Sequence, residues 1–120
     1  MVETKTSRVG DVTVVEMTGR LLLGNALGYA ENAINRLIDD GTRKLVLDLA
    51  GLDYIDSSGL GMLLFCGGRM EQAGGRMRVS GATPAVARVL QIAHADRVIQ
   101  LDADLETACR NLAGQNAAGV

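Results

Sequence analysis

The chain has 120 residues, and its 12 basic and 14 acidic residues give a formal net charge of −2 at pH 7. This length suits one domain with its own core, and the charge provides no basic surface for nucleic acid or anionic membranes. Two Tyr, one Phe and no Trp leave few rings on which bases could stack. We therefore expect no direct nucleic-acid binding.

The sequence lacks the patterns of a signal peptide, a membrane span and a metal site. Residues 1–6 are mostly polar, unlike a signal peptide, and the longest apolar run, Met62–Cys66, is far too short to cross a bilayer. Cys66 and Cys109 lack metal-ligand spacing. We expect one cytoplasmic domain over residues 1–120 without membrane insertion, metal or cofactor. Its ordered core should span about residues 3–113, with a frayed tail at 114–120.

The first two elements are predicted to be strands. Glu3–Val9 is mostly polar and suits a sheet edge, Gly10-Asp11 predicts a turn, and Val12–Thr18 is rich in β-branched residues. The loop that follows, Arg20–Gly24, contains three consecutive leucines at positions 21–23. These leucines either close the core or form part of an exposed docking patch.

A helix and a buried strand follow. Asn25–Asp40 has a helical apolar stripe, with Asn25 as its predicted cap and Gly41 as a left-handed stop. Leu45–Leu49 is apolar except for one Asp, as in a strand covered on both faces. A second helix should run from the polar turn at 56–59 to about Ala73. Its four glycines, at 59, 61, 67 and 68, make it a poor helix by propensity.

The last part of the chain repeats the alternation of strand and helix. Arg76–Ser80 is a predicted strand, Thr83-Pro84 begins a helix, and Arg97–Leu101 is a short strand before a helix capped by Asp102. The order is β-β-α-β-α-β-α-β-α. It predicts an α/β fold with four helices and a mixed, mostly parallel sheet of about five strands, with one antiparallel edge.

Two serines occupy the turn Asp56-Ser57-Ser58-Gly59. A serine hydroxyl at a helix start can accept a hydrogen bond from an otherwise unpaired N–H group, so these residues can simply cap the helix. A phosphate on either hydroxyl would also lie near the positive end of the helix dipole. Asp56 can orient the Ser57 hydroxyl, or its negative charge can simply be favourable at the positive end of the helix dipole.

The residues around this turn resemble a known family. The hexapeptide Asp56–Gly61 after the strand Leu45–Leu49, together with Thr83-Pro84-Ala85-Val86, is similar to STAS domains of bacterial anti-sigma factor antagonists. With the strand Val14–Gly19, Arg88 and Val98-Ile99, the resemblance covers nearly the whole chain. It implies a single STAS domain.

The resemblance also implies a function, which is a regulatory binding module rather than an enzyme. An anti-sigma factor with serine kinase activity would phosphorylate Ser57, with Ser58 as the less favoured acceptor. The unmodified form would bind that anti-sigma factor and release a sigma factor, and a PP2C-type phosphatase would restore it. The expected partner-binding residues are Asp56, Ser57, Ser58, Gly59, Gly61, Met62 and Phe65.

The helix after the turn presents two alternatives. For partner binding, its exposed face would include Gly61 and Met62 and can extend to Phe65 and Arg69. The buried stripe would then contain Leu60, Leu63, Leu64 and Gly67. Because the helix is apolar nearly all round, Met62 and Phe65 can instead belong to the core.

Two positions depart from the family pattern. An acidic residue is common just after the second strand, where this chain has Arg20-Leu21-Leu22, and a Ser-Gly pair is common where it has Ala93-His94. Both segments are predicted loops that can meet a partner, so they bear on which kinase acts. The sequence does not specify an oligomeric state.

Two other functions compete with the switch. The same fold can serve as an accessory subunit of a transporter or signalling complex, without phosphorylation. A serine hydrolase would have to use His94, the only histidine, but the serines lack a Gly-x-Ser-x-Gly elbow.

Overall fold

The computed structural model describes residues 2–116 and contains one five-stranded sheet with four α-helices. The strands are β1 (Val2–Val9), β2 (Val12–Leu21), β3 (Lys44–Ile55), β4 (Arg76–Ser80) and β5 (Gln100–Asp102). The helices are α1 (Asn25–Asp39), α2 (Ser57–Gln72), α3 (Pro84–Ile92) and α4 (Leu105–Asn116), with a 3₁₀ turn, η1, at Ala95–Arg97. The strand order is β1-β2-β3-β4-β5. Only the β1–β2 pair is antiparallel, which confirms the predicted fold class.

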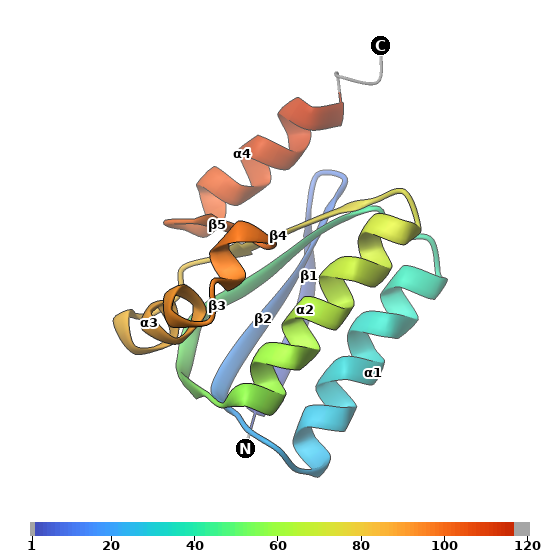
Figure 1. The fold of residues 1–120 in the computed structure, drawn as a ribbon. Coiled ribbons are helices and arrows are strands. Elements are labelled where there is room, and N and C mark those ends of the chain that lie inside the picture. Colours follow the sequence, from blue (N-terminus) through green and yellow to red (C-terminus); the bar gives the residue numbers. More distant parts are fainter. Residues whose placement is uncertain (1, 117–120) are drawn as a thin grey trace.

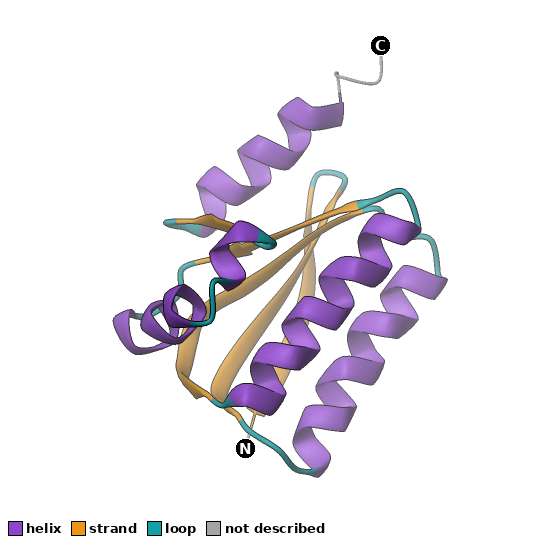
Figure 2. Cartoon of the chain, viewed as in Figure 1, coloured by secondary structure: helices purple, strands orange, loops and turns teal. Residues whose placement is uncertain are grey.

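The helices cover the two faces of the sheet unequally. Helices α1 and α2 lie side by side over one face, and α3 continues the same layer, whereas α4 lies on the opposite face (Figures 1 and 2). Alternation along the strands supplies a core to each layer. Val15 and Leu47 belong to the core beneath α1, α2 and α3, and Val14 and Val46 belong to the smaller core beneath α4.

The strand β1 forms the predicted edge. Every residue from Glu3 to Val9 is exposed, and only Val2 is buried. Charged side chains along this strand, at Glu3, Lys5 and Arg8, disfavour pairing with another chain. These charged side chains thus protect the long edge strand from pairing with another chain.

The strands β2 and β3 extend further than predicted, and this extension positions the polar turn. β2 continues through Leu21 and β3 through Ile55, with register shifts in their pairing after Glu16 and after Gly19. Leu21 and Ile55 are buried in the main core, whereas Leu23 is 77% exposed. The leucine run therefore both closes the core and reaches solvent.

Several predicted element ends are wrong. Gly24, not Asn25, precedes α1, and no side-chain hydrogen bond caps that helix. The strand predicted at Arg97–Leu101 begins only at Gln100, because Arg97 belongs to η1 and Val98 and Ile99 form the turn that follows it. The helix α4 continues through Asn116, and residues 117–120 of the predicted frayed tail lie outside the described residues.

Asp102 does not cap the last helix. The backbone N–H of Thr107 donates instead to Asp104 Oδ1 at 2.8 Å. The Asp102 carboxylate accepts hydrogen bonds from Arg78 Nη2 at 3.0 Å and from Asn111 Nδ2 at 2.8 Å. It therefore connects β4, β5 and α4. Asp102 thus helps to hold α4 against the sheet.

Candidate functional site

The polar turn lies where β3 passes into α2, and Asp56 organises it. Asp56 Oδ1 accepts a hydrogen bond from the Gly59 N–H at 2.9 Å, as an N-cap does. Its second oxygen, Oδ2, accepts one from the Leu23 N–H at 3.0 Å. The prediction that a serine can cap this helix is therefore wrong, because Asp56 is the cap. The same carboxylate also ties the β2–α1 loop to the start of α2.

These hydrogen bonds favour the ionised form of the Asp56 carboxyl. The N–H of Leu23, and then that of Gly59, lower the pKa of the carboxyl below its ordinary value of 3.8. Within residues 2–116, no hydrogen bond joins this carboxylate to the Ser57 hydroxyl, so the geometry favours the capping and dipole role over orientation of that hydroxyl.

The two serines differ in access. Ser57 is the first residue of α2 and is exposed, whereas Ser58 is half-buried. Since neither hydroxyl is needed to cap the helix, a modification at Ser57 need not break the cap. Ser57 is therefore the more accessible acceptor of the two.

Gly59 is buried at the closest approach between α2 and the end of β2. A Cβ at this position would overlap the Leu21 carbonyl oxygen and lie 2.8 Å from Ile55 Cγ1. Gly59 is expected from the sequence in the turn and on the partner-binding surface, but the structure gives it a packing role instead. The signal available was a glycine at the third helical position, which propensity disfavours.

One face of α2 carries an exposed strip, which we define as Ser57, Gly61 and Phe65. These residues are four apart, so they lie above one another on the helix surface. Gly61 borders open space, and the Phe65 side chain is 54% exposed. The strip thus places Gly61, which has no side chain, and the aromatic ring of Phe65 in line with the exposed Ser57.

The expected exposure of Met62 is wrong. Met62 is only 4% exposed, and the Cys66 thiol donates to its sulfur at 3.7 Å inside the core. Leu63 is fully buried as predicted, while Leu60 and Leu64 are half-buried and Arg69 lies at the margin of the exposed face. The helix is therefore rotated so that Phe65, and not Met62, faces solvent.

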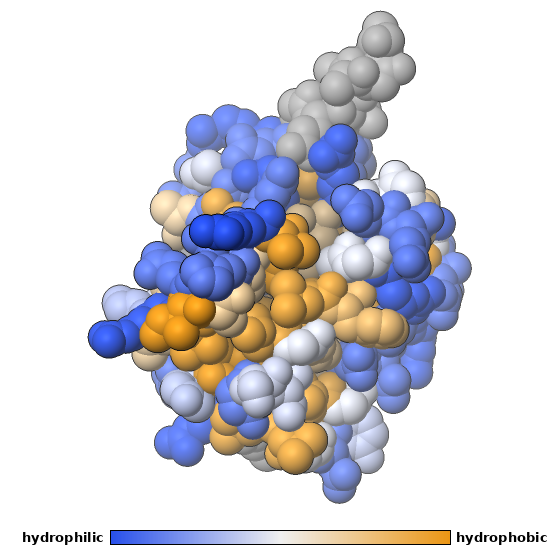
Figure 3. Space-filling view, viewed as in Figure 1, coloured by the Kyte–Doolittle hydropathy of each residue, from blue (hydrophilic) through white to orange (hydrophobic). Residues whose placement is uncertain are grey.

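Further apolar side chains are exposed on the segments that flank the turn and on α3. Leu23 follows β2, Tyr54 precedes Asp56 by two residues and is 47% exposed, and Ile92 ends α3. Figure 3 shows apolar residues gathered between α2 and α3 on the face that carries both helices. Contiguous apolar surface of this kind marks a protein-interaction site more often than a solvated face.

The remaining candidate chemistries receive no support within residues 2–116. No cluster of His, Cys, Asp and Glu side chains could hold a metal ion there, and no helix is long and apolar enough to cross a membrane. Burial raises the pKa of the Cys66 thiol to about 12, so this cysteine is an unreactive core residue.

The cap gives a prediction for pH. Because the folded state lowers the pKa of Asp56, the carboxylate contributes stability above its ordinary pKa of 3.8, and that contribution is lost as the pH falls through the folded value. We expect Asp56→Asn to be less stable than the parent protein at pH 7, and the difference to shrink as the solution is acidified below pH 3.8. Urea unfolding at a series of pH values measures this. A difference that stays constant with pH would contradict it.

Comparison with known proteins identifies relatives of this chain. The model of the STAS domain family matches residues 3–108. The predicted anti-sigma factor antagonist BtrV of Bordetella bronchiseptica is 38% identical over 55 residues, which are 46% of this chain and only 47% of BtrV. The TM1081 homologue of Thermotoga neapolitana, also a predicted anti-sigma factor antagonist, is 24% identical over 89% of this chain and 95% of its own.

Solved structures share the fold. The crystal structure of TM1081 from Thermotoga maritima has a TM-score of 0.83 at 22% identity, over 91% of this chain and 93% of TM1081. The anti-sigma factor antagonist SpoIIAA of Bacillus is known in two forms. The unphosphorylated form gives a TM-score of 0.78 at 22% identity, over 93% of this chain and 97% of SpoIIAA. The phosphorylated form gives 0.70 at 21% identity, over 90% and 98%.

Proposed function

Because the chain belongs to the STAS domain family, we propose that it is an anti-sigma factor antagonist controlled by phosphorylation of Ser57. The observation that carries the proposal is the exposed hydroxyl of Ser57 at the start of α2, beside a cap that Asp56 alone supplies. The named relatives are antagonists rather than enzymes, so the proposed role is regulatory binding in the cytoplasm without catalysis.

The proposed partner is an anti-sigma factor with serine kinase activity, and a PP2C-type phosphatase removes the phosphate. The unmodified chain binds the anti-sigma factor and frees a sigma factor, while the phosphorylated chain dissociates from the anti-sigma factor. Ser58, half-buried in the same turn, is the second choice of acceptor.

The proposed docking surface combines Asp56, Ser57 and Ser58 of the turn with Gly61 and Phe65 of the exposed strip. Gly59, also expected on this surface, is excluded because it is buried against Leu21 and Ile55. Gly61 lets another backbone approach closely, and the exposed ring of Phe65 provides an anchor of the type enriched at interface hot spots. Met62, expected on this surface, is excluded because it is buried.

The electrostatics of the turn support a switch that changes binding without unfolding. A phosphate adds about −1.5 to −2 charges at neutral pH. The positive end of the α2 dipole stabilises that charge, while the neighbouring Asp56 carboxylate, whose pKa is lowered by its hydrogen bonds, repels it. The phosphate therefore turns outward, where it adds negative charge and bulk to the surface that the partner must cover.

We expect Ser57→Asp to weaken binding to the anti-sigma factor by at least tenfold, about 1.4 kcal/mol, because it places a permanent charge on the docking surface. Ser57→Ala should retain binding and no longer respond to ATP. Isothermal titration calorimetry with the cognate anti-sigma factor measures both affinities, and mass spectrometry with fragmentation locates the phosphate after incubation with ATP.

Ser58→Ala is the matched control for the acceptor, because it removes the neighbouring hydroxyl and should leave phosphorylation of Ser57 unchanged. Equal affinities of the Ser57→Asp and Ser57→Ala variants would favour a static accessory subunit. A phosphate on Ser58, or on neither serine, would overturn the assignment.

A further inference from the structure

A second group of exposed side chains lies beside the polar turn, where the C-terminal ends of β2 and β3 run side by side (Figure 1). Arg20 of β2 is paired in register with Tyr54 of β3, and both side chains are exposed. Leu23, which is 77% exposed, follows β2, and its N–H donates to Asp56 Oδ2 at 3.0 Å. This group therefore adjoins the proposed docking surface through Asp56.

Arg20 and Tyr54 face away from the core beneath α2. Their neighbours Leu21 and Ile55 are buried in that core. Because successive side chains of a strand point to opposite faces, Arg20 and Tyr54 lie on the face of the sheet that carries α4. The strand residues in the core beneath α4 come from the other end of β2 and β3, at Val12, Val14 and Val46. The helix α4 thus leaves Arg20 and Tyr54 uncovered.

The charge of Arg20 is available to a partner. Among the ion pairs of residues 2–116, none includes Arg20. Asp53 has no partner in the β2–β3 pairing, because the register shift after Gly19 passes over it. The carboxylate of Asp56 accepts two backbone N–H groups. An arginine beside an exposed tyrosine is a combination that is enriched at protein interfaces.

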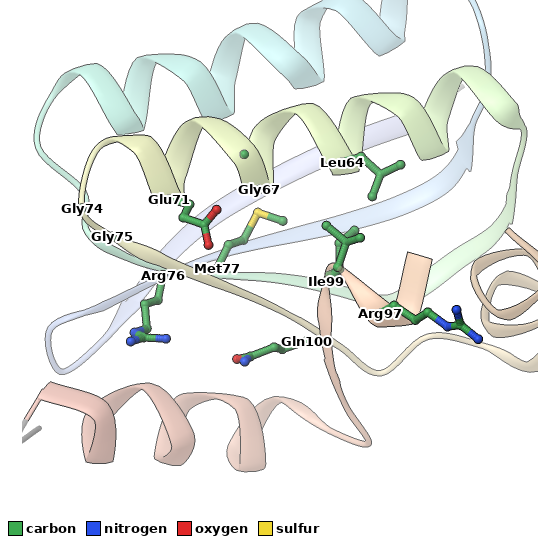
Figure 4. Close-up of a pocket in the computed structure, with 12 residues that line it drawn as sticks. Leu64, Gly67, Glu71, Gly74, Gly75, Arg76, Met77, Arg97, Ile99 and Gln100 are labelled. Carbon is green, nitrogen blue, oxygen red and sulfur yellow. The ribbon is translucent and has the colours of Figure 1, made fainter. Parts of the chain in front are cut away.

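The cavity beside the C-terminal half of α2 offers no comparable site. It has a volume of about 620 Å³ and lies between α2, the start of β4 and the segment from η1 to β5 (Figure 4). Its charged side chains do not converge. Glu71 is on the α2 face of the sheet, whereas Arg76 points to the α4 face and Arg97 points away from both (Figure 4). Charge complementarity therefore favours a partner at Arg20.

We propose that Arg20 is a specificity-determining residue, which pairs with a carboxylate of the anti-sigma factor while Leu23 and Tyr54 cover apolar atoms beside it. This inference rests on the proposed function and specifies the chemistry of the partner surface. A planar guanidinium can hold a carboxylate through two parallel hydrogen bonds, so the pair fixes orientation as well as charge. An anti-sigma factor with a basic residue at that place is repelled, and such repulsion excludes a wrong partner.

Isothermal titration calorimetry with the cognate anti-sigma factor tests the sign of the charge. We expect Arg20→Glu to weaken binding by about tenfold or more at low salt, and Arg20→Gln to weaken it less, because only the first replaces attraction with repulsion. The loss should shrink at high salt, which screens exposed charges. Thermal melts should show that both variants fold, since the side chain is exposed.

Arg8→Glu is the matched control. It makes the same change of charge at an exposed arginine, but beside the β1–β2 turn at the opposite end of the sheet (Figure 1). Its affinity should stay within about twofold of that of the parent protein, because only long-range electrostatics change.

Arg20→Lys retains the positive charge and introduces an amine, which a carbodiimide couples to a nearby carboxylate as an amide. We expect a cross-link between this position and an acidic residue of the anti-sigma factor, located by mass spectrometry and absent from the parent complex. The cross-linked residue identifies the carboxylate that Arg20 selects.

Three results would overturn the inference while the parent protein still binds and responds to Ser57→Asp. They are unchanged or tighter binding by Arg20→Glu, an equal loss with Arg8→Glu, and an Arg20→Lys complex without the new cross-link. Absence of binding by the parent protein would instead overturn the proposed function, and this inference with it.

Discussion

Met62→Lys should unfold the domain or lower its free energy of unfolding by about 3–5 kcal/mol, because an unpaired charge would enter the core. Met62 is 4% exposed and packs within the cluster beneath α2. Phe65→Lys, three residues along the same helix, changes a side chain that is 54% exposed. It should cost less than about 1 kcal/mol in stability. Binding to the anti-sigma factor should nevertheless fall at least tenfold.

A thermal melt beside a binding titration distinguishes the two positions. The pair controls for the introduced lysine and for its place on the same helix, so only burial differs. A stable Met62→Lys variant that loses binding would mean that the exposed face of α2 is misplaced. Unchanged binding by a folded Phe65→Lys variant would remove Phe65 from the docking surface.

Gly59→Ala should lower the free energy of unfolding by about 3 kcal/mol, at the upper end of the range for overpacked sites. The added methyl group would overlap the Leu21 carbonyl oxygen, which belongs to the backbone and cannot rotate away. Gly61→Ala is the matched control. Its Cβ meets nothing within 4 Å, so the better helix propensity of Ala should raise stability by up to about 1 kcal/mol.

Urea unfolding of the two glycine variants measures these opposite signs directly. Helix propensity favours alanine at both positions, so any loss of stability at Gly59 must come from its contacts with Leu21 of β2 and Ile55 of β3. A Gly59→Ala variant as stable as Gly61→Ala would show that the end of β2 can move away from α2. In that case, the turn would be less rigid than the hydrogen bonds of Asp56 indicate.

The order of elements followed from local patterns, because each strand or helix carries its own periodicity. The extension of β3 did not, since the segment after Leu49 contains Gly51 and Asp53 and reads as a loop. Leu52 and Ile55 are nevertheless buried, and the strand reaches them through irregular pairing with β2. Such shifts depend on contacts with a strand far away in sequence, which a local pattern does not record.

The site was predicted at the level of the turn but not of the individual groups. Serine and aspartate are both good caps, so composition could not show that Asp56 takes this role and leaves Ser57 free. The rotation of α2 was equally hidden, because apolar residues surround most of the helix. Only packing against the sheet distinguishes Met62 from Phe65. The sequence likewise predicts Asp102 as a cap, because its contacts with Arg78 and Asn111 are made through the folded structure.

The strand order β1-β2-β3-β4-β5 is also the order in which a ribosome delivers the strands. Each new strand can join the outer edge of the strand before it, and none has to be inserted between two that are already paired. Long-range pairing slows folding, and every pairing in this sheet joins strands that follow one another in the chain. The sheet can therefore grow in one direction during translation, with the charged strand β1 guarding its other edge from the beginning.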